Sequence, residues 1–302
     1  MVAQRLGQRV RSALGPHQGD FLIEDRTSRY VPSPRPTYDR PTLISRADVK
    51  RHVWGDREAG LVADWLYAST DKLHVLLFGI GPGRWFRHSP SYRTVFGADE
   101  VFLVLSGSMV AANPETGEVV EGDTGDFLFF RRDTWHHVYA KGDQPLRVLE
   151  FFAPPPSTGT SGIYAATRPY VEVPTYQRNH LFGDLWQESP PDSLRTIRRS
   201  DLSWRFDGEL RLGVVASTEH LTVALLEADA GAQGTAISHG GDAVVFGTAG
   251  ELMVRTFWSG HSETIEIGPH DAVFVPEGAE YEVLSFSTAA QAVVAVAPSY
   301  LR

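Results

Sequence analysis

The side chains that this sequence lacks limit its chemistry as much as those it contains. The 302 residues include no cysteine, which excludes disulfides, cysteine-ligated zinc, iron–sulfur clusters and a thiol nucleophile. Any metal ion must therefore be held by His, Asp or Glu, and the chain has 11 histidines. The glycine-rich stretch at 79–83 is followed by no helical pattern, so it predicts a turn rather than a phosphate-binding loop. No serine lies in a G-x-S-x-G context, so a serine hydrolase triad is not indicated.

Overall composition predicts a soluble protein with a substantial core. Hydrophobic residues make up 42% of the chain and charged residues 22%, the balance of a folded rather than a disordered chain. The formal charge of −9 argues against a surface that follows nucleic acid phosphates. No secretory signal and no run of about 18 apolar residues is present, so we expect a cytoplasmic protein without a membrane span.

Short apolar or alternating runs, separated by turn residues, fill two long stretches and indicate β-strands. The first 42 residues hold four closely spaced prolines, which favour an extended arm over a folded unit. We therefore predict an all-β chain in four parts: an N-terminal arm (1–42), an N-terminal barrel (43–155), a connector (156–205) and a C-terminal barrel (206–302).

The two β-rich stretches align with each other. Gly83 aligns with Gly231, Gly107 with Gly250 and the sequence ending at 154 with that ending at 298, at offsets of 148, 143 and 144 residues. Such anchors in one order predict a tandem repeat of one β-domain. The smaller second offset means that the first copy has about five extra residues between its two glycines, and insertions of this kind often carry function.

With these motifs the chain resembles the cupin superfamily, specifically the bicupins with two jelly-roll (double-stranded β-helix) barrels. Glu100, six residues and Gly107 match the end of the first cupin motif, and Gly125 to His136 follow the second. The usual His-x-His positions hold Thr94 and Phe96, which are poor metal ligands. The resemblance covers about residues 70–155 and 215–300, and it implies two barrels preceded by the extended arm.

The resemblance also implies a metal site in the N-terminal barrel. His88 lies near the position of the first motif histidine when counted from Gly83, so we expect His88, Glu100 and His136 to hold one divalent metal ion. Two imidazoles and one carboxylate with open positions favour Fe(II), with Mn, Ni or Zn as alternatives. His136 is followed by His137, and because strand side chains alternate, the motif register assigns His136 to the interior.

The remaining candidate residues surround this expected site. An arginine at a barrel mouth can bind a carboxylate in a bidentate manner, which makes Arg93 and Arg131 candidates for substrate binding. Trp135 is one of several rings that suit an apolar or aromatic substrate. Tyr92 or His137 is the expected proton donor or acceptor.

The second copy has lost most of its motif. Ala243 replaces the glutamate and Tyr281 the last histidine, and His239 alone remains, so we expect a structural copy without metal.

The expected function is a metal-dependent bicupin enzyme acting on a small oxygenated or aromatic carboxylate, either a dioxygenase or a metal-assisted lyase or isomerase. A bicupin that binds or senses a small ligand without catalysis is the first alternative, and a metal-free epimerase-type cupin is the second. The expected partners are a small-molecule substrate and a second copy of the chain, in a homodimer.

Overall fold

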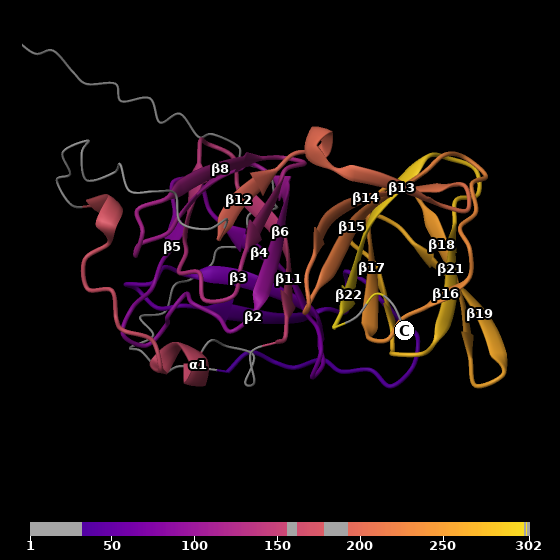
Figure 1. Cartoon of the computed structure of the whole chain (residues 1–302), viewed down its shortest axis with the longest axis horizontal. Helices are drawn as coiled ribbons and strands as arrows, with labels where there is room; N and C mark the ends of the chain where they lie inside the picture. The colour runs from indigo at the N-terminus through magenta and orange to yellow at the C-terminus, as the bar shows by residue number, and fades with distance from the viewer. Residues whose placement is uncertain (1–31, 156–161, 178–192, 299, 301–302) are drawn as a thin grey trace, which may run out of the picture.

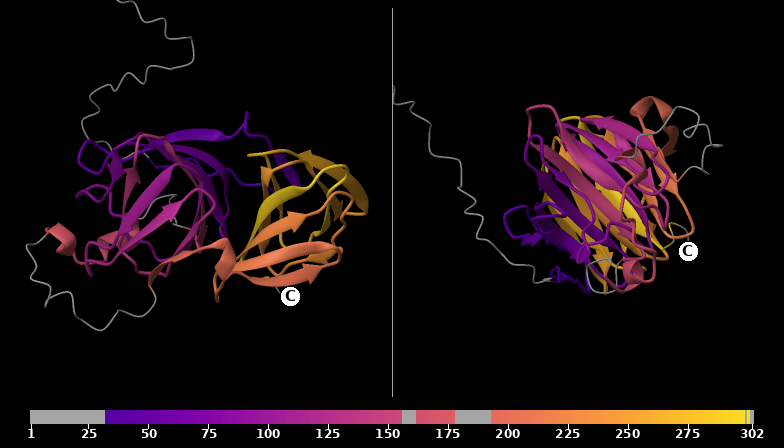
Figure 2. Two further views of the ribbon diagram at one scale, coloured as in Figure 1. Left: turned by 90° about the horizontal axis from the view of Figure 1, so that it is seen from above. Right: turned by 90° about the vertical axis from the view of Figure 1, so that its left-hand side faces the viewer.

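The computed structural model describes residues 32–155, 162–177, 193–298 and 300. These residues form two β-barrels that lie side by side, the first indigo to magenta and the second orange to yellow in Figures 1 and 2. The predicted all-β architecture of two tandem barrels is confirmed. No helix in these ranges is long and apolar enough to cross a membrane.

The N-terminal barrel consists of two antiparallel sheets (Figure 1). The larger has the order β12-β9-β6-β11-β4-β3-β2 and the smaller the order β5-β10-β7-β8. The strands of the larger sheet are β2 (Lys50–Trp54), β3 (Val62–Ser69), β4 (His74–Ile80), β6 (Asp99–Ser106), β9 (Phe127–Phe130), β11 (Leu146–Ala153) and β12 (Leu194–Ile197). Those of the smaller sheet are β5 (Trp85–Phe86), β7 (Ser108–Ala112), β8 (Val119–Asp123) and β10 (His137–Lys141).

The C-terminal barrel has the same two sheets, ordered β1-β20-β17-β22-β15-β14-β13 and β16-β21-β18-β19. Its larger sheet contains β1 (Thr42–Ile44), β13 (Ser203–Asp207), β14 (Leu210–Ser217), β15 (Thr222–Ala228), β17 (Asp242–Ala249), β20 (Ala272–Val275) and β22 (Ala290–Ala297). Its smaller sheet contains β16 (Ile237–Ser238), β18 (Leu252–Trp258), β19 (His261–Ile267) and β21 (Glu280–Leu284). The helix α1 (Gly162–Ala166) and the short 3₁₀ turns Thr175–Gln177 and Arg199–Asp201 lie between the barrels in the sequence.

The matching strand orders confirm the predicted repeat. Gly107 and Gly250 occupy equivalent turns with φ of 80° and 67°, where a Cβ would lie 2.9 Å and 2.5 Å from a backbone carbonyl oxygen. The extra length of the first copy is located after β5: twelve residues (87–98) join β5 to β6, whereas three (239–241) join β16 to β17.

The two barrels are joined by exchanged strands and a shared core. β1 precedes the first barrel in sequence but pairs with β20 of the second, and β12 from the connector pairs with β9 of the first. Between the larger sheets lies an apolar cluster to which both contribute, for example Leu103 and Phe129 from one barrel and Phe246 and Val293 from the other. Burial of this surface makes the interface between the barrels a continuous hydrophobic core.

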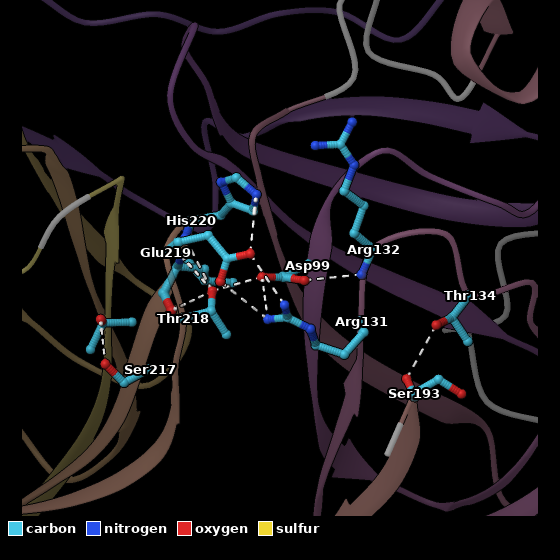
Figure 3. Close-up of polar contacts among 11 residues, drawn as sticks. Asp99, Arg131, Arg132, Thr134, Ser193, Ser217, Thr218, Glu219 and His220 are labelled. Carbon is cyan, nitrogen blue, oxygen red and sulfur yellow. Dashed lines mark hydrogen bonds and ion pairs between the residues drawn. The ribbon is translucent and has the colours of Figure 1, made fainter. Parts of the chain in front are cut away.

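A polar cluster flanks this core (Figure 3). Asp99, which is fully buried, accepts hydrogen bonds from the Arg132 N–H at 2.9 Å and from the Thr218 hydroxyl of the second barrel at 2.7 Å. The Arg131 guanidinium lies 3.1 Å from Asp99 and 3.2 Å from Glu219 of the second barrel. These contacts satisfy the buried carboxylate and connect the two barrels.

The repeat provides a second such contact. Asp242 stands in β17 where Asp99 stands in β6, and it accepts the Glu277 N–H at 3.0 Å and Lys72 Nζ of the first barrel at 3.2 Å. Asp99 and Asp242 are thus the first residues of equivalent strands, and each binds the turn before β15 or β4 in the other barrel.

Candidate functional site

Strand alternation divides the side chains of the N-terminal barrel into two sets. On β6, Phe102 and Val104 belong to the core inside the barrel, whereas Val101 and Leu103 belong to the core between the barrels. Glu100 shares the parity of Phe102 and is therefore directed inward, with 1% of its surface exposed. A carboxyl group is thus buried in an otherwise apolar barrel.

Three further polar side chains follow the same inward parity. Glu150 on β11 points to the same side as Val148 and Phe152, which belong to the core inside the barrel. Asp64 on β3 and His74 on β4 also point inward. All three are buried. The sequence contained the signal for Glu150 and Asp64, since each carboxyl takes an interior position of an apolar strand, but the motif comparison did not point to them.

These groups surround a cavity of about 60 Å³. Its walls come from β2, β3, β4, β5, β11, the insertion 87–98, the residue before β10 and the arm. The lining residues are Ser33, Trp54, Val62, Asp64, His74, Leu76, Phe78, Phe86, Thr94, Phe96, His136, Glu150 and Phe152. On this measure one water needs about 10–15 Å³, so the cavity has room for a few waters or a ligand of a few non-hydrogen atoms.

Glu100 and His136 face each other at one end of this interior. Glu100 Oε2 lies 3.6 Å from His136 Nε2 and is buried without a hydrogen-bond partner among the described residues. His136 Nδ1 lies 3.3 Å from the Thr134 carbonyl, which makes Nδ1 the donor and leaves the Nε2 lone pair directed at the carboxyl. Thr94 Oγ1, which is also buried, has no partner in the same part of the chain.

Burial favours the uncharged form of both members of this pair. Desolvation, followed by the nearby Glu150 and Asp99, raises the pKa of Glu100 well above its ordinary 4.5. Desolvation lowers the pKa of His136 to about 4, although its bond to Thr134 opposes the shift. Phe96 stacks on the imidazole at 5.7 Å and Phe130 lies at 4.6 Å, so apolar rings replace water around it.

Asp64 and Glu150 are two further buried acids in the interior of the same barrel. Asp64 Oδ2 is 3.3 Å from His52 Nδ1, and desolvation raises the pKa of Asp64 to about 6 against the opposing effect of His52. Desolvation, followed by the charge of Asp64, raises the pKa of Glu150 well above its ordinary value. His74 bonds Ser69 Oγ at 2.8 Å, and burial lowers the pKa of His74 to about 3.

His88 belongs to a different cluster from the one predicted. Its Nε2–H donates to the Val171 carbonyl at 2.8 Å, so its Nδ1 accepts from His137 Nε2–H at 2.7 Å. The Tyr176 hydroxyl then donates to His137 Nδ1 and accepts from the Tyr139 hydroxyl at 2.8 Å. Burial lowers the pKa of both histidines, which remain neutral links in this chain of hydrogen bonds.

The expected triad of His88, Glu100 and His136 is therefore not assembled. Glu100 and His136 come together as predicted, but His88 lies in the insertion on the outer side of the barrel wall and bonds His137 instead. In the ranges that the structure describes, no group of three or more His, Asp or Glu side chains is arranged to hold a metal ion. The position of His88 was predicted by counting residues from Gly83. That count does not give the path of the chain through the insertion, so the prediction for His88 was wrong.

Arg93, Trp135 and Tyr92, which were also predicted to act at the site, do not line the cavity. Arg93 donates to the carbonyls of Ala165 and Arg168, both at 2.9 Å, and Trp135 packs against Ala165 in a small apolar cluster. Both residues thus hold the connector against the barrel instead of a substrate. Tyr92 is buried against Trp54, with ring centroids 5.1 Å apart.

Arg131 was expected to bind a substrate carboxylate. Its guanidinium is instead held by Asp99 and Glu219 between the two barrels (Figure 3). The physical reason is strand parity, because Arg131 follows the inward-facing Phe130 and points away from the barrel interior.

Among the described residues of the second barrel, His239 is the one buried histidine. His239 Nε2 lies 2.9 Å from the Tyr281 hydroxyl and its Nδ1 lies 2.8 Å from the Tyr300 carbonyl, so both ring nitrogens have partners inside the protein. One imidazole does not make a site for a divalent ion, and the absence of metal from this copy stays a prediction.

Comparison with known proteins places this architecture in a class. Residues 97–152 match the cupin domain family. The fold is similar to the oxalate decarboxylase of Lactobacillus farciminis in its formate complex, with 13% identity, a TM-score of 0.60 and 90% of each chain covered. It is also similar to Bacillus subtilis oxalate decarboxylase, with 14% identity, a TM-score of 0.61 and coverage of 89% of this chain and 80% of that one. Another structure of the Bacillus subtilis enzyme, at 14% identity and a TM-score of 0.60, concerns that enzyme's Mn(II) centres.

The chain thus has a bicupin fold, and part of its first barrel matches the cupin domain family. At such low identity the likeness to the two decarboxylases shows the fold alone. No curated protein resembles the chain closely enough in sequence to count as a relative.

Proposed function

We propose that this bicupin is an enzyme whose N-terminal barrel transfers a proton on a small molecule, with Glu100 and His136 as the reacting pair. The observation that carries the proposal is that Glu100 Oε2, buried without a hydrogen-bond partner among the described residues, faces the Nε2 lone pair of His136 at 3.6 Å inside the barrel. Leaving a buried carboxyl unsatisfied costs about 1–3 kcal/mol, so the fold alone gives no reason to keep it.

The two groups supply complementary chemistry. A protonated Glu100 can donate a proton and a neutral His136 can accept one, and both states are those that burial favours at neutral pH. The Phe96 and Phe130 rings around the imidazole exclude water, which strengthens each electrostatic contact with a bound molecule. A small molecule bound beside the pair, in contact with both side chains, would lose a proton to His136 and gain one from Glu100.

A metal-dependent bicupin enzyme is the second candidate, and the same pair supports it. Two ligands of one ion at about 2.0–2.2 Å each are compatible with a separation of 3.6 Å between Nε2 and Oε2. The fit is incomplete, because Thr94 and Phe96 stand at the usual histidine positions and the described residues provide no third ligand. A divalent ion would supply Lewis-acid or oxygen chemistry, as in a dioxygenase, lyase or isomerase, only if solvent or substrate completed its coordination.

The experiment that tests both candidates begins with elemental analysis of protein purified without a histidine tag. The protein is then incubated in D₂O with small acids, alcohols, amides and amines of two to four non-hydrogen atoms. Loss of C–H signals in proton NMR would report proton transfer. The matched variants are His136→Ala in the first barrel and His239→Ala in the second.

The outcomes separate the candidates. Exchange that requires His136 but not His239, without metal, supports proton transfer. About one equivalent of Fe, Mn, Ni or Zn that is lost with His136→Ala supports the metal-dependent enzyme. Neither exchange nor metal, with ligand binding retained, would identify a binding or sensing bicupin and refute both candidates.

A further inference from the structure

The walls of the barrel cavity have an unusual charge character. Among the thirteen described residues that line it there is no lysine or arginine, whereas Asp64 and Glu150 both contribute carboxyl groups. Arg35 lies near the lining residue His74. It donates to Ser69 Oγ at 3.4 Å and to the Thr70 carbonyl at 2.5 Å. The polar lining therefore offers two carboxyl groups, which would ionise beside a bound cation, and no lysine or arginine to pair with an anion.

Aromatic rings form much of the remaining wall. Trp54 meets Phe86 and Phe78 meets Phe86 in edge-to-face pairs, with centroids 5.7 Å and 5.6 Å apart. Phe96 and Phe152 form a third such pair at 5.0 Å. The electron-rich faces of such rings attract cations, most strongly where water is excluded.

An unsatisfied hydroxyl points to a ligand. Thr94 lines the cavity with 1% of its surface exposed, and its Oγ1 has no hydrogen-bond partner in the described ranges. A native protein rarely keeps such a group unless something else occupies the site. A ligand with an N–H donor would satisfy the threonine oxygen and a neighbouring carboxylate together.

The same lining disfavours an anion. A carboxylate in this cavity would be desolvated next to two acidic side chains without a positive partner, and an unpaired buried charge is costly. Arg93 and Arg131, which were expected to bind a carboxylate, are engaged with the connector and with the second barrel.

We propose that the ligand of the N-terminal barrel is a small organic cation, a primary ammonium compound of two to four non-hydrogen atoms, held by Asp64, Glu150 and the aromatic wall. The size follows from the cavity volume of about 60 Å³. The inference deepens the proposed function and rests on it, because it assumes that this cavity is the substrate site.

The test compares three probes of similar size by calorimetry and by ligand-observed NMR on metal-free full-length protein. Ethylammonium is the cation, acetamide the neutral molecule and acetate the anion. The cavity variants are Asp64→Asn and Glu150→Gln. The control variant is Glu121→Gln, which removes a carboxylate from the exposed side of the same barrel.

We expect ethylammonium to bind at least tenfold more tightly than acetamide or acetate, and each cavity variant to weaken it at least tenfold while Glu121→Gln leaves it unchanged. The comparison of probes on the wild-type protein holds even if a variant does not fold. Equal or tighter binding of acetate would overturn the proposal, as would displacement of ethylammonium by one equivalent of Mn²⁺. Ethylammonium binding without any His136-dependent proton exchange would support the ligand class and refute the proposed reaction. Proton exchange on an acid or an amide alone would support the proposed reaction and refute the ligand class.

Discussion

Replacement of Asp64 by asparagine should make the protein more stable at neutral pH. Asp64 is 6% exposed, and burial raises the pKa of its carboxyl from 3.8 to about 6. Because the folded state holds the proton more tightly than the unfolded state, the carboxyl destabilises the fold wherever the unfolded chain has released it. The penalty is absent below pH 3.8 and complete above about pH 6.

The magnitude follows from the two pKa values. A difference of roughly two units, at about 1.4 kcal/mol per unit, gives a penalty of about 3 kcal/mol at pH 7 and about 1 kcal/mol at pH 4.5. Asparagine has nearly the same shape, carries no charge and can still accept a hydrogen bond from His52 Nδ1, which lies 3.3 Å from the carboxylate. Asp64→Asn should therefore gain about 3 kcal/mol at pH 7, and this gain should shrink as the pH falls.

Urea unfolding followed by tryptophan fluorescence at pH 4.5, 5.5 and 7 measures the difference. Asp143→Asn, in an exposed turn, is the control and should change the free energy of unfolding by less than about 0.5 kcal/mol at each pH. A variant that is less stable than the wild type at pH 7, or whose gain in the free energy of unfolding is the same at pH 4.5, would show that the Asp64 carboxyl does not destabilise the fold.

Three other outcomes test the remaining contacts. His136→Ala should abolish the proton exchange or metal content of the protein, whereas His239→Ala should leave both unchanged and cost at most about 1–3 kcal/mol in urea unfolding, through partners left unpaired. Asp99→Ala should cost about 2–3 kcal/mol in the same assay, less than a fully buried ion pair because water still reaches Arg131. Tyr176→Phe removes a hydroxyl bonded to a buried imidazole, and hydrogen exchange of residues 162–177 should accelerate while that of β6 stays unchanged.

The fold could be predicted from the sequence because its signals are local and repeated. The glycines of the repeat mark turns that require a positive φ, and the alternation of apolar residues fixes which side of each strand faces inward. The cupin motif register located Glu100 and His136 in the barrel interior. Each of these inferences required only counting along the chain from a recognised motif or strand.

The rest of the site depends on segments without a period. The insertion reverses direction where Ser89 and Tyr92 exchange backbone hydrogen bonds at 2.6 Å and 3.2 Å, and this reversal leaves His88 on the outer side of the wall. Arg93 and Trp135 contact the connector, about 30 to 75 residues further along the chain. Neither the path of an irregular loop nor a contact over that distance is encoded in residue spacing, so these assignments failed together.

The second barrel shows why the polar interior of the first is best explained by function. Strand register makes Ala243 the counterpart of Glu100, Val294 the counterpart of Glu150 and Leu212 the counterpart of Asp64. The same sheets therefore close around apolar side chains at all three positions, without the cost of burying carboxyl groups. Since the fold does not require these acids, their presence in one copy means that the first barrel keeps a stability penalty that the second avoids. Such a penalty is expected where the groups act on a ligand, which is the reason to look for the chemistry of this chain in its N-terminal barrel.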